Sequence, residues 1–486
     1  MNPKTINKFI LLFMVFTAAI FIVDHKSVNA VEGGIMNSIS LNSPEENTKL
    51  LKGMIEKGDY DLVTIEKLLD HGANPNAKTQ RDTLFVDVIQ SNAPIAAVKL
   101  FVKKGANLAY KDHYKQDLFY LAAMGTKNPD IVDFLVEKGF KCHELKNNMS
   151  ANHLLVAINY NESLAVIRAF AKVCPINAKN HLGENALFYA LNRDPRGPTD
   201  VMAELIKMGL DVNEKNGVGQ TLLNKAVSWK FSLEMINLLI KSGAKVKATN
   251  EDGQNALHYI YCIEDINIAK TLIKAGVNVN AKRKINNETP LYNAIFLDAP
   301  KENVELLLKS GARVDVRYGR LNTILHVTID SNRDDDIFQM LVNAGADVNA
   351  QNGLGETPLM TAILERRKDN KINILLASKK IKLEIKGEYG DTALTLAASA
   401  GADLEHVIKP LVKRGAKVNA INDFGWSVLI RAVHGNCPLE TFKFLVENGA
   451  DVNIKSKKGE TALSETKKGY GDRKAIIDYL ISVGAK

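Results

Sequence analysis

The chain has 486 residues, of which 46% are hydrophobic and 24% charged, so its composition excludes an intrinsically disordered or fibrous protein. The formal net charge is +8, but Lys and Arg recur just before glycines, near expected helix C-termini, and form no stripe that would follow a nucleic-acid backbone. We therefore expect no nucleic-acid partner.

The first thirty residues have the order of an export signal. Basic residues precede an apolar run over 9–23, polar residues follow, and the small residue Ala30 ends the segment. The apolar run is shorter than the roughly 20 residues that a membrane-spanning helix needs. We expect a signal peptide over 1–30, cleaved after Ala30, and an exported chain that is periplasmic, bound to the cell surface or extracellular. A chain anchored in the membrane by an uncleaved N-terminal segment is the alternative.

Residues 31–42 lack periodicity and are expected to form a flexible leader. The next residues, Ser43-Pro44-Glu45-Glu46, predict a helix start, because Ser can cap the helix, Pro fits the first position and Glu can complete a capping box. We expect the folded part of the chain to cover 43–486, with its first and last units acting as caps.

A unit of about 34 residues recurs through this region. Each unit closes on a phrase such as Gly345-Ala346-Asp347-Val348-Asn349-Ala350, and the closing positions define thirteen units. Two apolar-periodic segments precede the closing glycine, which is the residue that a left-handed helix cap prefers. Val173 and Lys380 replace this glycine in two units, where we expect the array to be locally bent and less stable.

A second phrase marks the start of each unit's first helix. Thr289-Pro290 and Thr357-Pro358 are its intact copies, since Thr caps the free amides and Pro at the first helical position loses no hydrogen bond. His258 and His326 follow the Leu of their helix starts, and we expect them to tie the turn by hydrogen bonds rather than to act as ligands or acid–base groups.

In its period, its Thr-Pro-Leu helix start and its Gly-Ala-x-x-Asn-Ala close, the chain resembles the ankyrin repeat family. The resemblance covers nearly all of the chain from about Leu50 to Lys486. It implies an all-α solenoid of stacked helix-turn-helix units with projecting β-turn fingers, a concave helical face, and function by protein recognition. One unit cannot bury its apolar face alone, which agrees with stacking.

No motif for catalysis, nucleotide binding or a metalloenzyme occurs, so we expect no enzyme, no cofactor, no metal and no small-molecule substrate. Cys142, His143, His153 and Cys174 lie in adjacent units, and free buried thiols are the first expectation there, a disulfide the second and a metal site the third. Equivalent positions of adjacent units lie about 10 Å apart, too far for a disulfide without local adjustment. Cys262 and Cys437 are five units apart and cannot pair with each other.

The sequence thus predicts a non-enzymatic scaffold that binds a protein of unknown identity. A secreted effector or toxin, whose repeats target a host or neighbouring protein, is the alternative. Consecutive fingers carry Leu354, Tyr389 and Phe424 at one position, with Trp426 close by. Equivalent positions align in a stack, so these four residues should form an apolar ridge flanked by Arg320 and Lys458. Apolar anchors with a charged rim are typical of protein interfaces, although packing of finger on finger explains the same pattern.

Overall fold

The computed structural model describes residues 42–145, 152–192, 199–331, 334–365, 370–468 and 473–486. Within these ranges the chain is helical, and its only extended pairings are isolated β-bridges such as the one between Ile421 and Ser427. The predicted signal peptide, its cleavage site at Ala30 and the leader up to residue 41 lie outside the described residues. The described chain forms two compact units, one ending at Asp211 and one beginning at Val212.

The first unit is built of paired helices of seven to thirteen residues. They are α3 (Pro44–Glu56), α4 (Leu62–Asp70), α5 (Leu84–Gln90), α6 (Ile95–Lys103), α7 (Leu118–Gly125), α8 (Pro129–Glu137), α9 (His153–Tyr160), α10 (Leu164–Val173), α11 (Ala186–Asn192) and α12 (Thr199–Lys207).

The second unit continues the same pairing, with short 3-10 turns and one π-helical turn, η4. Its elements are α13 (Leu222–Ser228), α14 (Leu233–Lys241), η1 (Ala256–Cys262), α15 (Ile266–Lys274), α16 (Pro290–Phe296), α17 (Lys301–Lys309), η2 (Gly319–Leu321), α18 (Ile324–Asp330), α19 (Asp335–Asn343), α20 (Pro358–Leu364), α21 (Lys371–Ala377), η3 (Glu388–Gly390), α22 (Ala393–Ser399), η4 (Leu404–Ile408), α23 (Lys409–Lys413), α24 (Val428–His434), α25 (Leu439–Glu447), α26 (Ala462–Lys468) and α27 (Lys474–Ser482).

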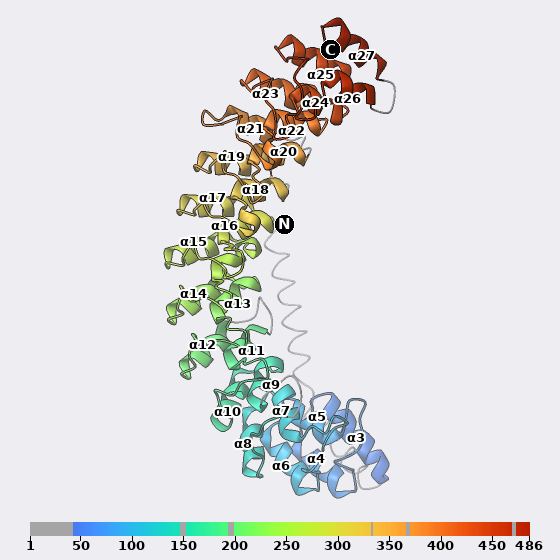
Figure 1. The fold of residues 1–486 in the computed structure, drawn as a ribbon. Helices are drawn as coiled ribbons and strands as arrows, with labels where there is room; N and C mark the ends of the chain where they lie inside the picture. Colours follow the sequence, from blue (N-terminus) through green and yellow to red (C-terminus); the bar gives the residue numbers. More distant parts are fainter. Residues whose placement is uncertain (1–41, 146–151, 193–198, 332–333, 366–369, 469–472) are drawn as a thin grey trace, which may run out of the picture. The chain divides into compact units, whose positions relative to one another are not determined.

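In each unit the helices lie in two layers. The first helix of a pair contacts the first helices of the neighbouring pairs, as in α5–α7–α9 and in α20–α22–α24, and the second helices contact one another likewise. Figure 1 shows both layers along the second unit. Between the terminal helices α3 and α26, the first helices are short and mostly apolar because neighbours cover both of their sides, and together with the second helices they form the core.

The sequence signals at the helix ends act as expected. Ser43 and Glu46 form a reciprocal capping box at the start of α3. The glycines that close most repeats have positive φ, for example 100° at Gly415, which a residue without Cβ adopts at no steric cost.

Two repeats lack the closing glycine and end differently. Cys174 ends α10 with φ −106° and ψ 147°, and Ser378 ends α21 with φ −66° and ψ 126°. The chain therefore leaves both helices in an extended conformation, and neither Val173 nor Lys380 has positive φ.

The π-helical turn η4, which precedes α23, was not predicted from the sequence. The N–H of Lys409 bonds to the carbonyl of Leu404, five residues earlier, and Pro410 follows without an N–H of its own. Pro410 inside a helical segment was the available signal.

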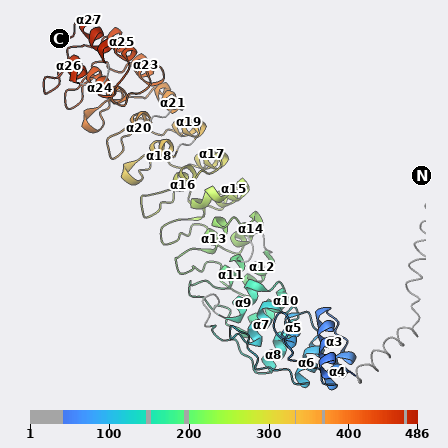
Figure 2. The ribbon, with the colours of Figure 1, turned by 90° about the vertical axis from the view of Figure 1, so that its right-hand side faces the viewer.

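Fingers, the turns that precede the first helices, project from one side of the second unit (Figure 2). No described helix combines the length and apolar character needed to cross a lipid bilayer.

Candidate functional site

The finger over 421–427 shows how the local sequence fixes side chains at a tip. The Asn422 side-chain oxygen accepts hydrogen bonds from the backbone N–H groups of Phe424 and Trp426, both at 3.0 Å. The Ile421–Ser427 bridge closes the base, and Ser427 caps α24. An Asn side chain that binds backbone groups two and four residues later holds such a turn in one conformation.

Three of the four predicted binding residues are brought together by this arrangement. The ring centroids of Tyr389 and Phe424 lie 6.0 Å apart, and those of Phe424 and Trp426 lie 4.9 Å apart. Both separations are typical of interacting aromatic pairs. Leu354 stands at the equivalent position of the preceding finger. We call Leu354, Tyr389, Phe424 and Trp426 the finger ridge.

The finger ridge is largely open to solvent. Tyr389 is 59% exposed, Leu354 48% and Phe424 45%, whereas Trp426 is half-buried. The flanking Arg320 and Lys458 are exposed as well. The ridge therefore combines apolar anchors with charged neighbours on one series of fingers.

Trp426 packs against the adjacent helix α24. Its ring lies 4.8 Å from the ring of His434 in an edge-on arrangement and 5.6 Å from the guanidinium carbon of Arg431. Its indole N–H donates to a Glu460 carboxylate oxygen at 3.4 Å. Trp426 thus joins the finger ridge to polar groups at the first helices.

A buried ion pair lies beneath this area. Arg431 of α24 donates to an Asp391 carboxylate oxygen at 2.8 Å, and Asn422 donates to the other oxygen at 3.2 Å. Burial raises the pKa of Asp391, although Arg431 opposes that shift, and burial lowers the pKa of Arg431. The pair links the finger that carries Tyr389 to the helix under Trp426.

One feature of the ridge was not predicted from the sequence. Tyr389 has φ 60°, in the left-handed region that non-glycine residues seldom occupy. Its finger has Gly387 where the next finger has Asn422, so it lacks the bracing amide and forms the 3-10 turn η3 instead.

The predicted helix-start residues are placed at helix starts. Thr289 and Thr357 accept hydrogen bonds from backbone N–H groups at 3.2 and 3.3 Å, and Pro290 and Pro358 begin α16 and α20.

His258 and His326 are buried and bridge two repeats. In each, Nδ1 bonds within its own helix start, and Nε2 lies 3.3 Å from the carbonyl oxygen of Glu288 or 3.0 Å from that of Glu356, one finger further along. Burial lowers the pKa of both histidines to about 4. They are therefore neutral at pH 7, in keeping with a structural role.

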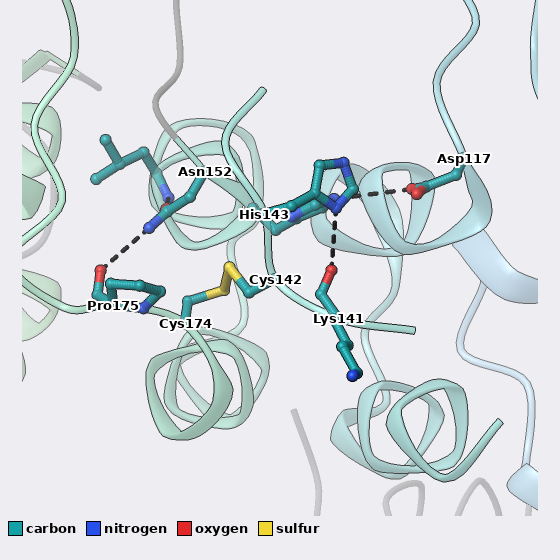
Figure 3. The surroundings of a disulfide bond; sticks show 9 residues. Asp117, Lys141, Cys142, His143, Asn152, Cys174 and Pro175 are labelled. Carbon is teal, nitrogen blue, oxygen red and sulfur yellow. Dashed lines mark hydrogen bonds and ion pairs between the residues drawn. A yellow bond between two sulfur atoms is a disulfide. The ribbon is translucent and has the colours of Figure 1, made fainter. Parts of the chain in front are cut away.

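The expectation for Cys142 and Cys174 is corrected. The structure pairs them in a disulfide with a Cα–Cα distance of 5.1 Å (Figure 3), whereas free thiols were the first expectation. The separation of about 10 Å expected from the sequence applies only to equivalent positions of adjacent repeats. Cys142 lies three residues past Gly139 and Cys174 directly after Val173, so the two positions are not equivalent, and the connector after α8 reaches the next repeat. Cys262 and Cys437 are free.

Comparison with known proteins agrees with this geometry. A family model described as "Ankyrin repeats (3 copies)" matches residues 154–250, 223–318 and 325–422, and one described as "Ankyrin repeat" matches 424–457. The mouse B-cell lymphoma 3 protein homolog is 32% identical over 198 residues, which cover 39% of this chain and 43% of that protein.

Two further matches are partial. The E3 ubiquitin-protein ligase KEG of Arabidopsis thaliana is 26% identical over 249 residues, covering 48% of this chain and 15% of the ligase. The crystal structure of the ankyrin repeat domain of Bcl-3 is 26% identical and covers 41% of this chain and 88% of that one, with a TM-score of 0.36. The chain thus spans less than half the length of these two curated relatives.

The matched ranges take in more than half of the chain, and the same helix pairs, glycine caps and fingers recur along them. The chain belongs to the ankyrin repeat family.

Proposed function

We propose that this chain is an exported, non-enzymatic scaffold that binds a protein partner through the concave face and finger tips of its repeats. Ankyrin repeats are generally protein-interaction modules, which supports the broad class. The observation that carries the proposal is the finger ridge, because four large apolar side chains, three of them exposed by 45% or more, occupy consecutive fingers.

The physical argument is that protein interfaces concentrate aromatic anchors inside a polar rim. Tyr389 and Phe424 provide rigid rings whose few rotatable bonds cost little entropy on binding. Arg320 and Lys458 flank them, so a partner with an apolar patch and acidic neighbours would fit this surface best. A partner of that kind would cover the rings and pair with the flanking cations.

Packing within the protein is the alternative explanation of the ridge. It explains part of the placement of Trp426, which is half-buried against α24. It accounts less well for Tyr389 and Phe424. Neighbouring fingers are already joined through their backbones, since Asp423 N–H bonds to the Tyr389 carbonyl at 2.9 Å and Lys457 N–H to the Phe424 carbonyl at 3.0 Å. The fingers are therefore joined even without the ring contacts, and the exposed parts of Tyr389 and Phe424 are available to a partner.

Export is proposed from the signal peptide expected over 1–30, and the paired Cys142 and Cys174 support it, because disulfides persist in oxidising compartments. Mass measurement of the N-terminus of the protein recovered from its native location tests this part. A chain beginning at residue 31 is the expected result, and an intact Met1 would contradict cleavage after Ala30.

Affinity capture tests the binding function. The chain from residue 31 is used as bait on cell-envelope extract and on culture medium, in parallel with a Phe424→Ala, Trp426→Ala bait. We expect a protein that the native bait retains and the variant loses. If both baits retain the same proteins in equal amounts, the finger ridge is not the binding surface.

A further inference from the structure

A second group of polar side chains lies in the first unit, away from the finger ridge. Asp117, His143 and His153 come from three different segments, and each offers one ligand atom within 4.8 Å of the others. Asp117 precedes α7, His143 belongs to the connector after α8, and His153 begins α9. Figure 3 shows Asp117 and His143 in the surroundings of the disulfide.

His153 is exceptional among the repeats. It occupies the first position of the first helix, which is apolar in every other pair that the structure describes. Those residues are Pro44, Leu84, Leu118, Ala186, Leu222, Ala256, Pro290, Ile324, Pro358, Ala393, Val428 and Ala462. A packing role alone does not require an imidazole at this position, since Leu, Ala, Pro, Ile and Val all fill it elsewhere.

The imidazole of His153 is fully buried and unsatisfied. Its exposure is 0%, and neither ring nitrogen has a hydrogen-bond partner among the described residues. The nearest acidic atom is an Asp117 carboxylate oxygen, 3.7 Å from Nε2, which is too long for a hydrogen bond. A buried polar group without a partner destabilises the fold, so a ligand that binds one of these nitrogens would remove that penalty.

Asp117 is also unusual for its position. It caps α7 by accepting the Tyr120 N–H at 2.9 Å. The other first-helix caps in the described chain are neutral Ser, Thr or Asn side chains, at Ser43, Thr83, Asn152, Asn185, Thr221, Asn255, Thr289, Thr323, Thr357, Thr392, Ser427 and Thr461. The single carboxylate among these caps thus faces the single buried histidine at a first position.

His143 completes the group with a defined orientation. Its Nδ1–H donates to the carbonyl oxygen of Lys141 at 3.1 Å, which leaves Nε2 as the ligand atom. A carbonyl that accepts from the non-ligating nitrogen is the usual partner of a metal-binding histidine. Cys142, the preceding residue, is tied to Cys174 by the disulfide, so His143 is held beside the start of α9. The two imidazole rings are edge-on, with centroids 4.7 Å apart.

We propose that Asp117, His143 and His153 bind a divalent transition-metal ion of the zinc class, and that the Cys142–Cys174 disulfide holds His143 in position for it. Two imidazole nitrogens and one carboxylate oxygen suit Zn²⁺ and related ions, whereas Ca²⁺ and Mg²⁺ prefer oxygen ligands. His143 is exposed and Asp117 partly so, which leaves the fourth coordination position open to water. The ion would tie the connector after α8 to the starts of α7 and α9.

Zinc titration tests the proposal. The full chain, purified without a histidine tag and treated with EDTA, is titrated with Zn²⁺ in a calorimeter, and its melting temperature is recorded with and without the ion. The ligand variants are His153→Leu, Asp117→Thr and His143→Ala. Leu and Thr occupy these positions in other repeats, so the variants should keep the fold. His181→Ala, which removes an exposed histidine from another finger of the same unit, is the matched control.

One Zn²⁺ per chain and a higher melting temperature are expected for the native chain and for His181→Ala. Each ligand variant should bind at least 10-fold more weakly, and a Cys142→Ser, Cys174→Ser double variant should weaken binding without abolishing it. No binding at micromolar Zn²⁺, or equal binding by His153→Leu and the native chain, would overturn the site. Equal affinity in the double Cys variant would overturn the role of the disulfide.

Discussion

The backbone N–H of Asp423 donates to the carbonyl oxygen of Tyr389 at 2.9 Å, while the Tyr389 side chain stays 59% exposed. Neighbouring fingers are therefore joined by their backbones, with the rings above the junction. The Gly353 N–H donates to the carbonyl oxygen of Arg320 at 2.8 Å in the same way, although the tip residues of these two fingers, Arg320 and Leu354, are not aromatic. The stack should consequently tolerate loss of the exposed rings better than loss of the groups beneath them.

The buried ion pair between Asp391 and Arg431 provides the contrast. Arg431→Ala leaves the Asp391 carboxylate buried without its cation, and we expect a loss of about 3 kcal/mol in local stability. Hydrogen exchange of the α22 and α24 amides measures it. Arg168→Ala removes a similarly short but far more exposed pair with Glu204 and should have a much smaller effect on its own repeat. Equal effects in the two variants would contradict the burial argument.

Gly435 and Gly53 both have helical φ, yet replacing them with Ala should change the stability of the chain in opposite directions. At Gly435 an added Cβ would lie 2.0 Å from the carbonyl oxygen of Ala398, so Gly435→Ala should destabilise the chain by about 1–3 kcal/mol. At Gly53, inside α3, nothing lies within 4 Å of the added atom, and Gly53→Ala should stabilise by roughly 0.5–1 kcal/mol. Denaturant unfolding of both variants gives the signs, and a stabilised Gly435→Ala would disprove the close approach of α22 and α24.

His258 and His326 predict an acid-sensitive fold. Their pKa is about 4 in the folded chain and 6.5 when free, so the unfolded chain binds more protons between these values. Stability should be complete above about pH 6.5 and fall as the pH drops toward 4, by about 3 kcal/mol for each histidine.

A matched variant isolates the histidine contribution. Thr395 stands at the position of His326 in another repeat and forms its own reciprocal cap with Thr392. His326→Thr should therefore remain folded and show a smaller loss of stability between pH 7 and pH 4.5 than the native chain. Identical pH dependence in both would mean that folding does not lower the pKa of His326.

The four cysteines predict a simple thiol count. Under denaturing conditions we expect two reactive thiols without reductant and four with it. In the folded chain Cys262 should react before Cys437, because Cys437 is buried and burial raises its pKa to about 11. Four thiols without reductant would show that Cys142 and Cys174 are unpaired.

Local signals made much of the fold predictable. Ser43 with Glu46, and Thr289 with Pro290, mark helix starts through residues that are close in sequence. The closing glycines mark the helix ends. The contacts of Asp117 with His153 and of Cys142 with Cys174 join residues more than thirty positions apart, and each depends on how one connector crosses to the next repeat. The left-handed Tyr389 depends on the absence of an Asn side chain from its own finger. The two long-range contacts appear only once the repeats are stacked, whereas Gly387 in place of the bracing Asn was a local signal in the sequence.

Binding of a protein partner by the finger ridge is tested most directly with a captured partner. Its dissociation constant is compared between the native chain and the Phe424→Ala, Trp426→Ala double variant. Melting temperature is measured on the same samples, with Tyr114→Ala, an exposed aromatic residue on a finger of the first unit, as the control. We predict affinity at least 10-fold weaker for the double variant, with only a small fall in melting temperature from the lost contacts of Trp426, and native affinity for the control. A lowered melting temperature with native affinity would contradict the account, because the rings would then only hold the fingers together.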